Sequence, residues 1–278
     1  MSQPPYASFT ATPLTRRIGA EISGIDITRP LTPAQRDDVE RALLDYQVIF
    51  FRDQPFDLAS QKAFGRLFGE LHVHPGAPGP QEHPEILRIH ADEKSTYVAG
   101  EGWHSDVSCD AEPPLGSILH LHTVPPGGGD TLWASMYAAY DALSDRFKAL
   151  LEGLTATHDG EHVYRGRYRS LGTDDAGRTY PRASHPVVRT HPATGRKALF
   201  VNPGFTTRID GLPRGESDAI LAFLYTHSQK PDFQVRFHWQ PDSVAFWDNR
   251  CTQHLAIWDY YPEVRSGHRV TIQGDKPF

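Results

Sequence analysis

The 278-residue chain has little cysteine, no excess of positive charge and no long apolar run. Its two cysteines, Cys109 and Cys251, are too few for a disulfide framework and indicate a reducing compartment. There are 28 lysines and arginines against 34 aspartates and glutamates, so the net charge of -6 gives no basic surface for nucleic acid. Because a membrane span and a basic, apolar leader are also missing, we expect a cytoplasmic protein with no membrane or nucleic-acid partner.

Short runs rich in valine, isoleucine and aromatic residues indicate a globular, strand-rich chain. Thr32, Pro33 and Gln35 predict a helix start, with a threonine N-cap, a proline in the first turn and a capping-box glutamine. Further helices are predicted over residues 58–68, 135–153 and 215–228. Strands are predicted over 47–51, 71–74, 85–89, 116–122, 131–133, 185–190, 197–202, 233–239, 243–247 and 268–273.

This element order predicts an α+β, mostly β fold, a double sheet of the barrel or jelly-roll kind with flanking helices. The chain shows no internal repeat and no linker, so we expect residues 1–278 to form a single domain. Residues 160–184 are polar, rich in arginine and without a clear period. A segment of that length inside a compact domain is typical of a functional lid or a mobile loop.

His104 and Asp106 form a His-x-Asp motif that could bind a metal ion. Side chains at i and i+2 of an extended strand point to the same face, so both could reach one metal ion. Adding His254 gives two imidazoles and one carboxylate, the pattern of non-haem iron oxygenases. Because the chain has 15 histidines, a single histidine in a strand is weak evidence for a metal ligand. We expect His120, His191 and His238 to be packed or surface side chains.

A zinc site is a second interpretation, because Cys251 and His254 have a Cys-x-x-His spacing. The partner pair that a zinc site of this type requires is missing from the sequence. Cys109 and Cys251 are therefore expected to be small packing residues near the site.

Several motifs resemble, in one order, the taurine dioxygenase family of iron(II)/2-oxoglutarate-dependent dioxygenases. The resemblance extends from about residue 12 to the end of the chain. The matching stretches are Trp103–Val107, Gly128–Trp133, His185–His191, Phe200–Asn202, Gly204–Arg208, Trp247–Arg250, Thr252–His254 and Arg269–Ile272.

The resemblance implies a double-stranded β-helix, or jelly roll, that uses Fe(II), 2-oxoglutarate and O2. His104, Asp106 and His254 match the family's iron ligands. Arg265, eleven residues after His254, matches the arginine that binds the far carboxylate of 2-oxoglutarate, and Thr131 matches the threonine that joins it. A permanently charged, forked donor is suited to that carboxylate. Without the resemblance, Thr131 would be interpreted as an ordinary strand hydroxyl after a glycine turn.

The resemblance also suggests substrate contacts at Arg269, His74 and Phe205. Arg269 lies four residues after Arg265, so on a strand both would face the same side. In the taurine-hydroxylating relatives, the matching arginine and histidine receive the anionic head of the substrate, and the aromatic residue forms a wall. A surface arginine is the alternative for Arg269.

Three positions depart from the taurine pattern. Ala77, Gly100 and Gly160 stand where those relatives have tyrosine, asparagine and phenylalanine. These small residues predict a substrate with an anionic head that is larger than taurine or different from it. Alternatively, Tyr164 or an arginine of the 160–184 segment refills the space.

The predicted activity is hydroxylation of a small anionic organic substrate, coupled to decarboxylation of 2-oxoglutarate to succinate. A taurine-like sulfonate or an alkyl sulfate would release sulfite or sulfate, which suggests a role in sulfur metabolism. An aryloxy- or other carboxylate is the alternative substrate. A jelly-roll metal-binding protein without oxygenase activity would not need Arg265 and Thr131. The resemblance further implies a homodimer or homotetramer.

Overall fold

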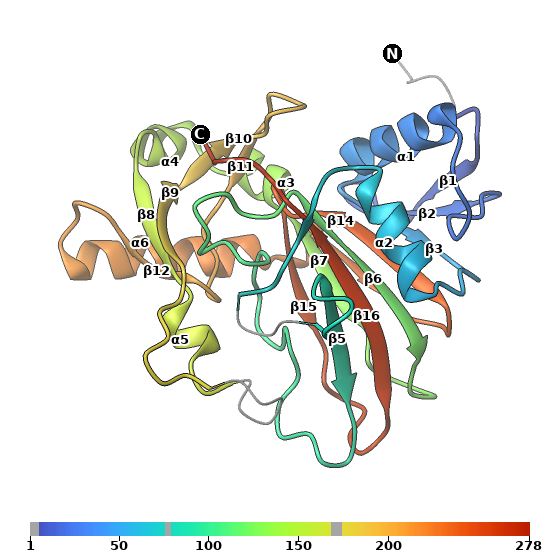
Figure 1. The fold of residues 1–278 in the computed structure, drawn as a ribbon. Helices are drawn as coiled ribbons and strands as arrows, with labels where there is room; N and C mark the ends of the chain where they lie inside the picture. The colour runs from blue at the N-terminus through green and yellow to red at the C-terminus, as the bar shows by residue number, and fades with distance from the viewer. Residues whose placement is uncertain (1–5, 76–78, 168–173) are drawn as a thin grey trace.

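The computed structural model describes residues 6–75, 79–167 and 174–278. Its larger sheet follows the order β1-β2-β3-β14-β6-β16-β4, with β5 also paired to β16 (Figure 1). All its neighbouring strands are antiparallel except β2 and β3. The strands are β1 (Thr10–Pro13), β2 (Ala20–Ser23), β3 (Val48–Phe51), β4 (Leu71–His72), β5 (Ile86–Ala91), β6 (Gly116–Thr123), β14 (Ser243–Asp248) and β16 (Arg265–Ile272).

Both faces of this sheet are covered, as the burial of all six residues of β14 shows. Alternate side chains of a strand point to opposite faces. Val244 and Phe246 accordingly pack on the outer side with residues of α1 (Pro33–Tyr46) and α2 (Leu58–Arg66). Ala245 and Trp247 point to the inner side. Helices α1 and α2 lie across the outer face in Figure 1.

The inner side faces a second, three-stranded antiparallel sheet of order β13-β7-β15. Its strands are β7 (Thr131–Ser135), β13 (Gln234–Phe237) and β15 (Thr252–Ala256). Phe50 of the larger sheet stacks on Phe237 of the smaller one, with ring centroids 4.0 Å apart. Two mainly antiparallel sheets packed through such a core form a jelly roll. The predicted fold class, an α+β, mostly β jelly roll with flanking helices, is confirmed.

The remaining elements gather at one end of the jelly roll, on the left of Figure 1. A sheet of order β12-β8-β9 and the hairpin β10-β11 lie there with the later helices. These elements are α3 (Met136–Asp141), α4 (Asp145–Leu151), β8 (Thr155–Asp159), α5 (Glu161–Tyr164), β9 (Arg182–Pro186), β10 (Val188–Thr190), β11 (Lys197–Leu199), β12 (Thr206–Ile209), α6 (Arg214–Ser228) and the 3-10 turn η2 (Pro231–Phe233).

The sequence signal for a helix start at Thr32 agrees with the structure. The Thr32 hydroxyl accepts from the Gln35 backbone, and the Gln35 side chain accepts from Thr32, so the predicted capping box is confirmed. The single helix predicted over 135–153 is wrong. Ser144 accepts from the backbone N–H of Phe147 and starts α4 as a separate helix, since serine competes well for helix N-termini.

Two other expectations were incomplete. The strand predicted over residues 185–190 divides between β9, which pairs with β8, and β10, which pairs with β11. The segment 160–184 contains α5 and the beginning of β9, while its residues 168–173 lie outside the described part. Its role as a lid stays a prediction.

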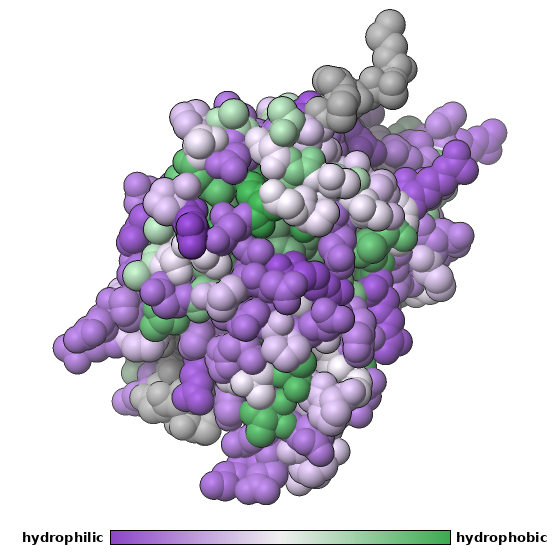
Figure 2. Space-filling model, turned by 90° about the vertical axis from the view of Figure 1, so that its right-hand side faces the viewer, coloured by the Kyte–Doolittle hydropathy of each residue, from purple (hydrophilic) through white to green (hydrophobic). Residues whose placement is uncertain are grey.

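Among the described residues, no helix combines the length and apolar character needed to cross a membrane. Figure 2 views the side on which α1 and α2 lie in Figure 1, and hydrophilic residues dominate it, with smaller apolar patches between them.

Candidate active site

A cavity of about 330 Å³ lies inside the jelly roll. Both sheets contribute to its lining, together with loops from the end that carries α5. All eight residues predicted from the sequence line this one cavity: His74, His104, Asp106, Thr131, Phe205, His254, Arg265 and Arg269. Residues that are up to 195 positions apart in sequence are thus brought together, since His74 and Arg269 are the outermost of them.

Two histidines are joined through their backbones. His104 N donates to His254 O at 3.1 Å, and His254 N donates to His104 O at 2.8 Å. Their rings lie side by side, with centroids 4.1 Å apart. The expectation that His104 and Asp106 share a strand is wrong. His104 and His254 form an isolated bridge, and Asp106 begins a turn. The turn is tight, since Val107 has a φ of 47°.

Asp106 is held through both its main chain and its carboxylate. Its N–H donates to Asn249 Oδ1 at 2.7 Å, and Asn249 Nδ2 donates to its carbonyl at 2.9 Å. The Ser117 hydroxyl donates to Oδ2 at 2.7 Å, and Arg269 Nη1 lies 2.6 Å from Oδ1. Burial opposes ionisation, but the charge of Arg269 holds the pKa of Asp106 well below its usual range. The carboxylate is therefore charged at neutral pH.

The two histidines and Asp106 fit a divalent metal ion. The Nε2 atoms of His104 and His254 lie 3.6 and 3.9 Å from Asp106 Oδ1. Metal–ligand bonds of about 2.1 Å place neighbouring ligand atoms about 3 Å apart, so small shifts suffice. His104 Nδ1 donates to Gly102 O at 2.8 Å, which leaves the Nε2 lone pair available. Burial, then the nearby His104, lowers the pKa of His254 well below its usual range, so its imidazole is neutral.

Arg265 is a buried cation whose hydrogen-bond partners among the described residues are uncharged. Its Nε donates to Gly129 O at 3.0 Å and its Nη2 to Thr131 Oγ1 at 3.1 Å. The Trp239 indole donates to the same hydroxyl at 3.0 Å. Within the described ranges, no carboxylate lies within 4.0 Å of this guanidinium. Burial lowers its pKa to about 10, so the group remains charged at neutral pH and favours an anion in the cavity.

The other side of the cavity carries the predicted substrate contacts. The ring of Tyr164 lies between those of His74 and Phe205, at centroid distances of 5.2 and 5.7 Å. Burial, followed by the charge of Arg269, lowers the pKa of His74 to about 3. His74 is therefore neutral, and Arg269 supplies the positive charge of this region.

The departures from the taurine pattern have different outcomes. A Cβ at Gly160 would lie 3.0 Å from Cys109 Sγ and 3.1 Å from the Tyr164 ring, so Tyr164 refills that space. Gly100 does line the cavity, and a Cβ there would lie 3.1 Å from the His104 ring. Ala77 lies outside the described residues.

Apolar side chains form much of the remaining wall. They are Leu87, Ile89, Val107, Leu119 and Val163. Glu101 and Arg167 also line the cavity, and 46% and 29% of their side chains are exposed, so they mark its opening to solvent. They form an ion pair at 3.3 Å. The cavity therefore has a cationic interior, apolar walls and a charge-balanced mouth.

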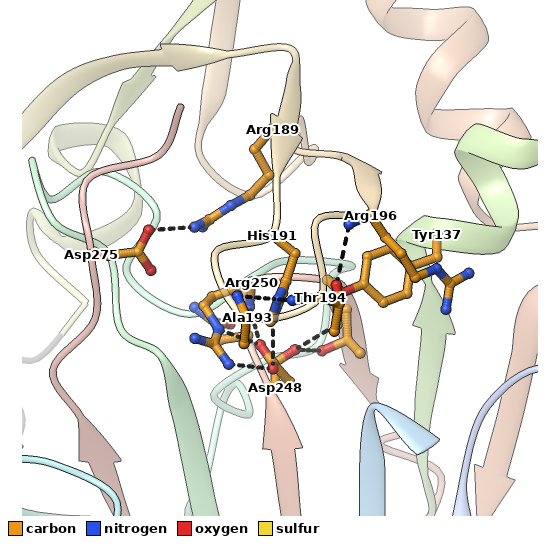
Figure 3. A network of polar contacts seen from close by, with 12 residues as sticks. Tyr137, Arg189, His191, Ala193, Thr194, Arg196, Asp248, Arg250 and Asp275 are labelled. Atoms are coloured by element: carbon orange, nitrogen blue, oxygen red, sulfur yellow. Dashed lines mark hydrogen bonds and ion pairs between the residues drawn. The ribbon is translucent and has the colours of Figure 1, made fainter. Parts of the chain in front are cut away.

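A second group of potential metal ligands, His191, Asp248 and Cys251, is buried. Figure 3 shows His191 and Arg250 directed toward Asp248. His191 Nε2 and Arg250 both bond to Asp248, while His191 Nδ1 accepts from the backbone of the following turn. These bonds use both ring nitrogens and both carboxylate oxygens, so the group is structural. Because Cys251 belongs here and not with His254, the geometry does not favour the alternative zinc site. Cys109 and Cys251 are both buried and free, as packing residues.

Three residues that hydrogen-bond to Asp106 or Thr131 were not predicted from the sequence: Ser117, Asn249 and Trp239. Asn249 lies within the quoted Trp247–Arg250 motif, and this membership was its only signal. Ser117 and Trp239 lie in or beside ordinary predicted strands, and only strand pairing brings them to Asp106 and Thr131.

The jelly roll with two histidines and one carboxylate is typical of non-haem iron oxygenases. Residues 10–271 match the model of the family described as "Taurine catabolism dioxygenase TauD, TfdA family". This match covers nearly the whole chain, and the protein belongs to that family.

Individual relatives agree with this placement. An alpha-ketoglutarate-dependent sulfate ester dioxygenase from Pseudomonas putida is 35% identical, over 95% of this chain and 89% of that protein. The crystal structure of a taurine dioxygenase from Burkholderia xenovorans is 37% identical, with a TM-score of 0.83 over 97% of this chain and 92% of the other. AAD-2, solved with Mn(II) and N-oxalylglycine, is 29% identical, with a TM-score of 0.84 over 97% and 99%.

We predict that Ser117→Ala weakens metal binding about 10- to 100-fold, because Asp106 loses a bond that orients it. Titration of the apoprotein with Mn(II) would measure the change. Ser184→Ala is the matched control, since it removes a serine–aspartate bond to Asp210 outside the cavity. Equal affinities of Ser117→Ala and the unaltered protein would contradict the prediction.

We predict that Asp248→Asn lowers the free energy of unfolding by about 3–5 kcal/mol at pH 7, because it leaves buried Arg250 without its counter-charge. Burial opposes ionisation of Asp248, but Arg250 and His191 depress its pKa. This carboxylate therefore stabilises the protein above the unfolded pKa of about 3.9, and the benefit is lost as pH falls through the lower native pKa.

Urea unfolding at pH 7 and at pH 3 would test both statements. The difference between the unaltered protein and Asp248→Asn should narrow at the lower pH. Asp218→Asn, at an exposed ion pair with Arg214, is the control and should change stability by less than about 1 kcal/mol.

Proposed function

We propose that the protein is an Fe(II)/2-oxoglutarate-dependent dioxygenase that hydroxylates a small organic substrate with an anionic head. The observation that carries this proposal is Arg265, a buried guanidinium that lines the same cavity as the two histidines and Asp106. A protein that only held a metal would bear the free-energy cost of this buried charge without using it. A dicarboxylate bound near the metal compensates it.

In this proposal His104, Asp106 and His254 hold the iron, and Arg265 with the Thr131 hydroxyl binds the far carboxylate of 2-oxoglutarate. When bound, iron and 2-oxoglutarate supply oxygen activation coupled to decarboxylation to succinate. Asn249 and Ser117 keep the Asp106 carboxylate in place. Trp239 orients the Thr131 hydroxyl so that it can also donate to an incoming anion.

In this proposal the anionic head of the substrate binds to Arg269. The Nε of Arg269 is buried and has no hydrogen-bond partner among the described residues. His74 lies nearby as a neutral side chain. The apolar wall of Leu87, Ile89 and Leu119 would hold the carbon part of the substrate and exclude water from it. A sulfonate or an alkyl sulfate suits this arrangement, and hydroxylation of the carbon that bears the head would release sulfite or sulfate.

An aryloxy- or other carboxylate is the second candidate substrate class. The aromatic rings of Phe205 and Tyr164 in the cavity wall favour it, since they could pack on an aryl group. The single domain over residues 1–278, the cytoplasmic location and the homodimer or homotetramer stay predictions.

Oxygen uptake by the protein loaded anaerobically with Fe(II) and given 2-oxoglutarate tests the proposal. The panel contains taurine, longer alkylsulfonates, alkyl sulfates and aryloxyacetates. We expect one anionic class to stimulate oxygen uptake with equimolar succinate, and sulfite or sulfate to appear with the sulfur compounds. Binding of 2-oxoglutarate without stimulation by any panel member would reject the substrate classes alone. Failure to bind both iron and 2-oxoglutarate would reject the oxygenase.

We predict that Arg265→Met weakens 2-oxoglutarate binding about 30-fold or more, because a buried charge pair is lost. Isothermal titration calorimetry of the Mn(II)-loaded protein would measure it. Arg208→Met is the control, because the Arg208 side chain is 58% exposed and lies outside the cavity lining. Unchanged affinity in Arg265→Met would remove this residue from the proposed role.

A further inference from the structure

Three histidines share the outer face of the larger sheet, opposite to the cavity. His120 and His122 lie at i and i+2 of β6, so both point to the same face. His268 of the neighbouring antiparallel strand β16 is the direct cross-strand partner of His120. The rings of His122 and His268 are 5.3 Å apart and those of His120 and His122 are 6.2 Å apart.

His120 is prepared for metal binding by its neighbour Asp242. Its Nε2 lies 3.0 Å from Asp242 Oδ1, so this nitrogen carries the proton and the other, Nδ1, carries the lone pair. That Nδ1 is buried and has no hydrogen-bond partner in the described part of the chain. A carboxylate that fixes the tautomer of a ligating histidine is a regular feature of protein metal sites.

The charge state of His268 and His120 also favours a metal ion. Burial, followed by the neighbouring His122 and His120, lowers the pKa of His268 to about 4. Burial lowers the pKa of His120 as well, although Asp242 opposes the shift. Neutral imidazole is the form that binds metals, and a lowered pKa keeps His268 and His120 in this form at neutral pH.

One ring pair of this cluster already has the spacing of a metal site, whereas the three ligand nitrogens do not all lie within 4.8 Å of one another, so a bound ion requires the rings to move closer together. Two imidazoles bound to one ion through bonds of about 2.0–2.1 Å have ring centroids about 5 Å apart. The His122–His268 pair already matches this value. His122 is exposed and can rotate toward His120. Arg88, the cross-strand partner of His268 on its other side, is the opposing cation, and Asp242 is the compensating anion.

The geometry points to a second metal site, formed by His120, His122 and His268, for a divalent ion that prefers imidazole, such as Zn²⁺. The outer-face site is separate from the cavity, because these side chains point away from it and none of them lines it. A bound ion would cross-link β6 to β16. Since β16 carries Arg265 and Arg269 on its other face, the ion would stabilise the strand that supplies both cavity arginines.

Zinc titration of the chelator-treated, full-length protein against a chromogenic zinc indicator tests this inference. We expect two ions per chain in the unaltered protein, because the cavity group also binds zinc. His122→Ala should weaken one of the two ions at least about tenfold, and Asp242→Asn should weaken the same ion about 10- to 100-fold. His104→Ala should lose the other ion and retain the outer-face site.

The matched control is His83→Ala, which removes a partly buried histidine outside the cavity lining that is paired with Lys62. It should keep both ions. Iron-dependent oxygen uptake should be unchanged in His122→Ala, since that residue is outside the cavity. One zinc ion per chain in the unaltered protein, or two ions of unaltered affinity in both His122→Ala and Asp242→Asn, would overturn the inference and leave the histidines as a packed row.

Discussion

The two backbone hydrogen bonds between His104 and His254 are the interaction on which the cavity depends. They join a loop after β5 to the middle of β15, and the imidazoles start from directly opposed residues. A side chain alone could not hold the loop so closely, because loops lack the regular pairing of a sheet. Asn249 completes the junction by bonding to both the N–H and the carbonyl of Asp106. The ligand geometry is therefore set by the main chain.

Charge is distributed unevenly around this junction. Arg269 has Asp106 as a counter-charge, whereas Arg265 donates to a carbonyl and a hydroxyl of the described residues. Deep burial makes the second arrangement expensive unless an anion enters, and the apolar neighbours keep water from screening the charge. The Asp248 network differs from Arg265 in this respect. Asp248 is paired with Arg250 and hydrogen-bonded to His191, so the network requires no further ligand.

Much of this fold and cavity could be predicted from the sequence, and the exceptions have physical causes. The continuous apolar run Val48–Phe51 and the Thr32 capping box are local signals, and both can be recognised in the sequence. The break at Ser144 needed a choice between two helix starts that propensity alone does not make. All eight predicted site residues came together, because motif order preserves the pairing of strands. Ser117 was missed, since its partner Asp106 is reached only across the folded sheet.

Arg265 and Arg269 project from one continuous strand, which sets the span between the two positive centres. Four residues of extended chain cover about 13 Å, so β16 acts as a fixed spacer inside the cavity. A single inserted or deleted residue between them would turn one guanidinium to the opposite face of the sheet. The strand can therefore tolerate exchange of side chains more readily than any change in its length.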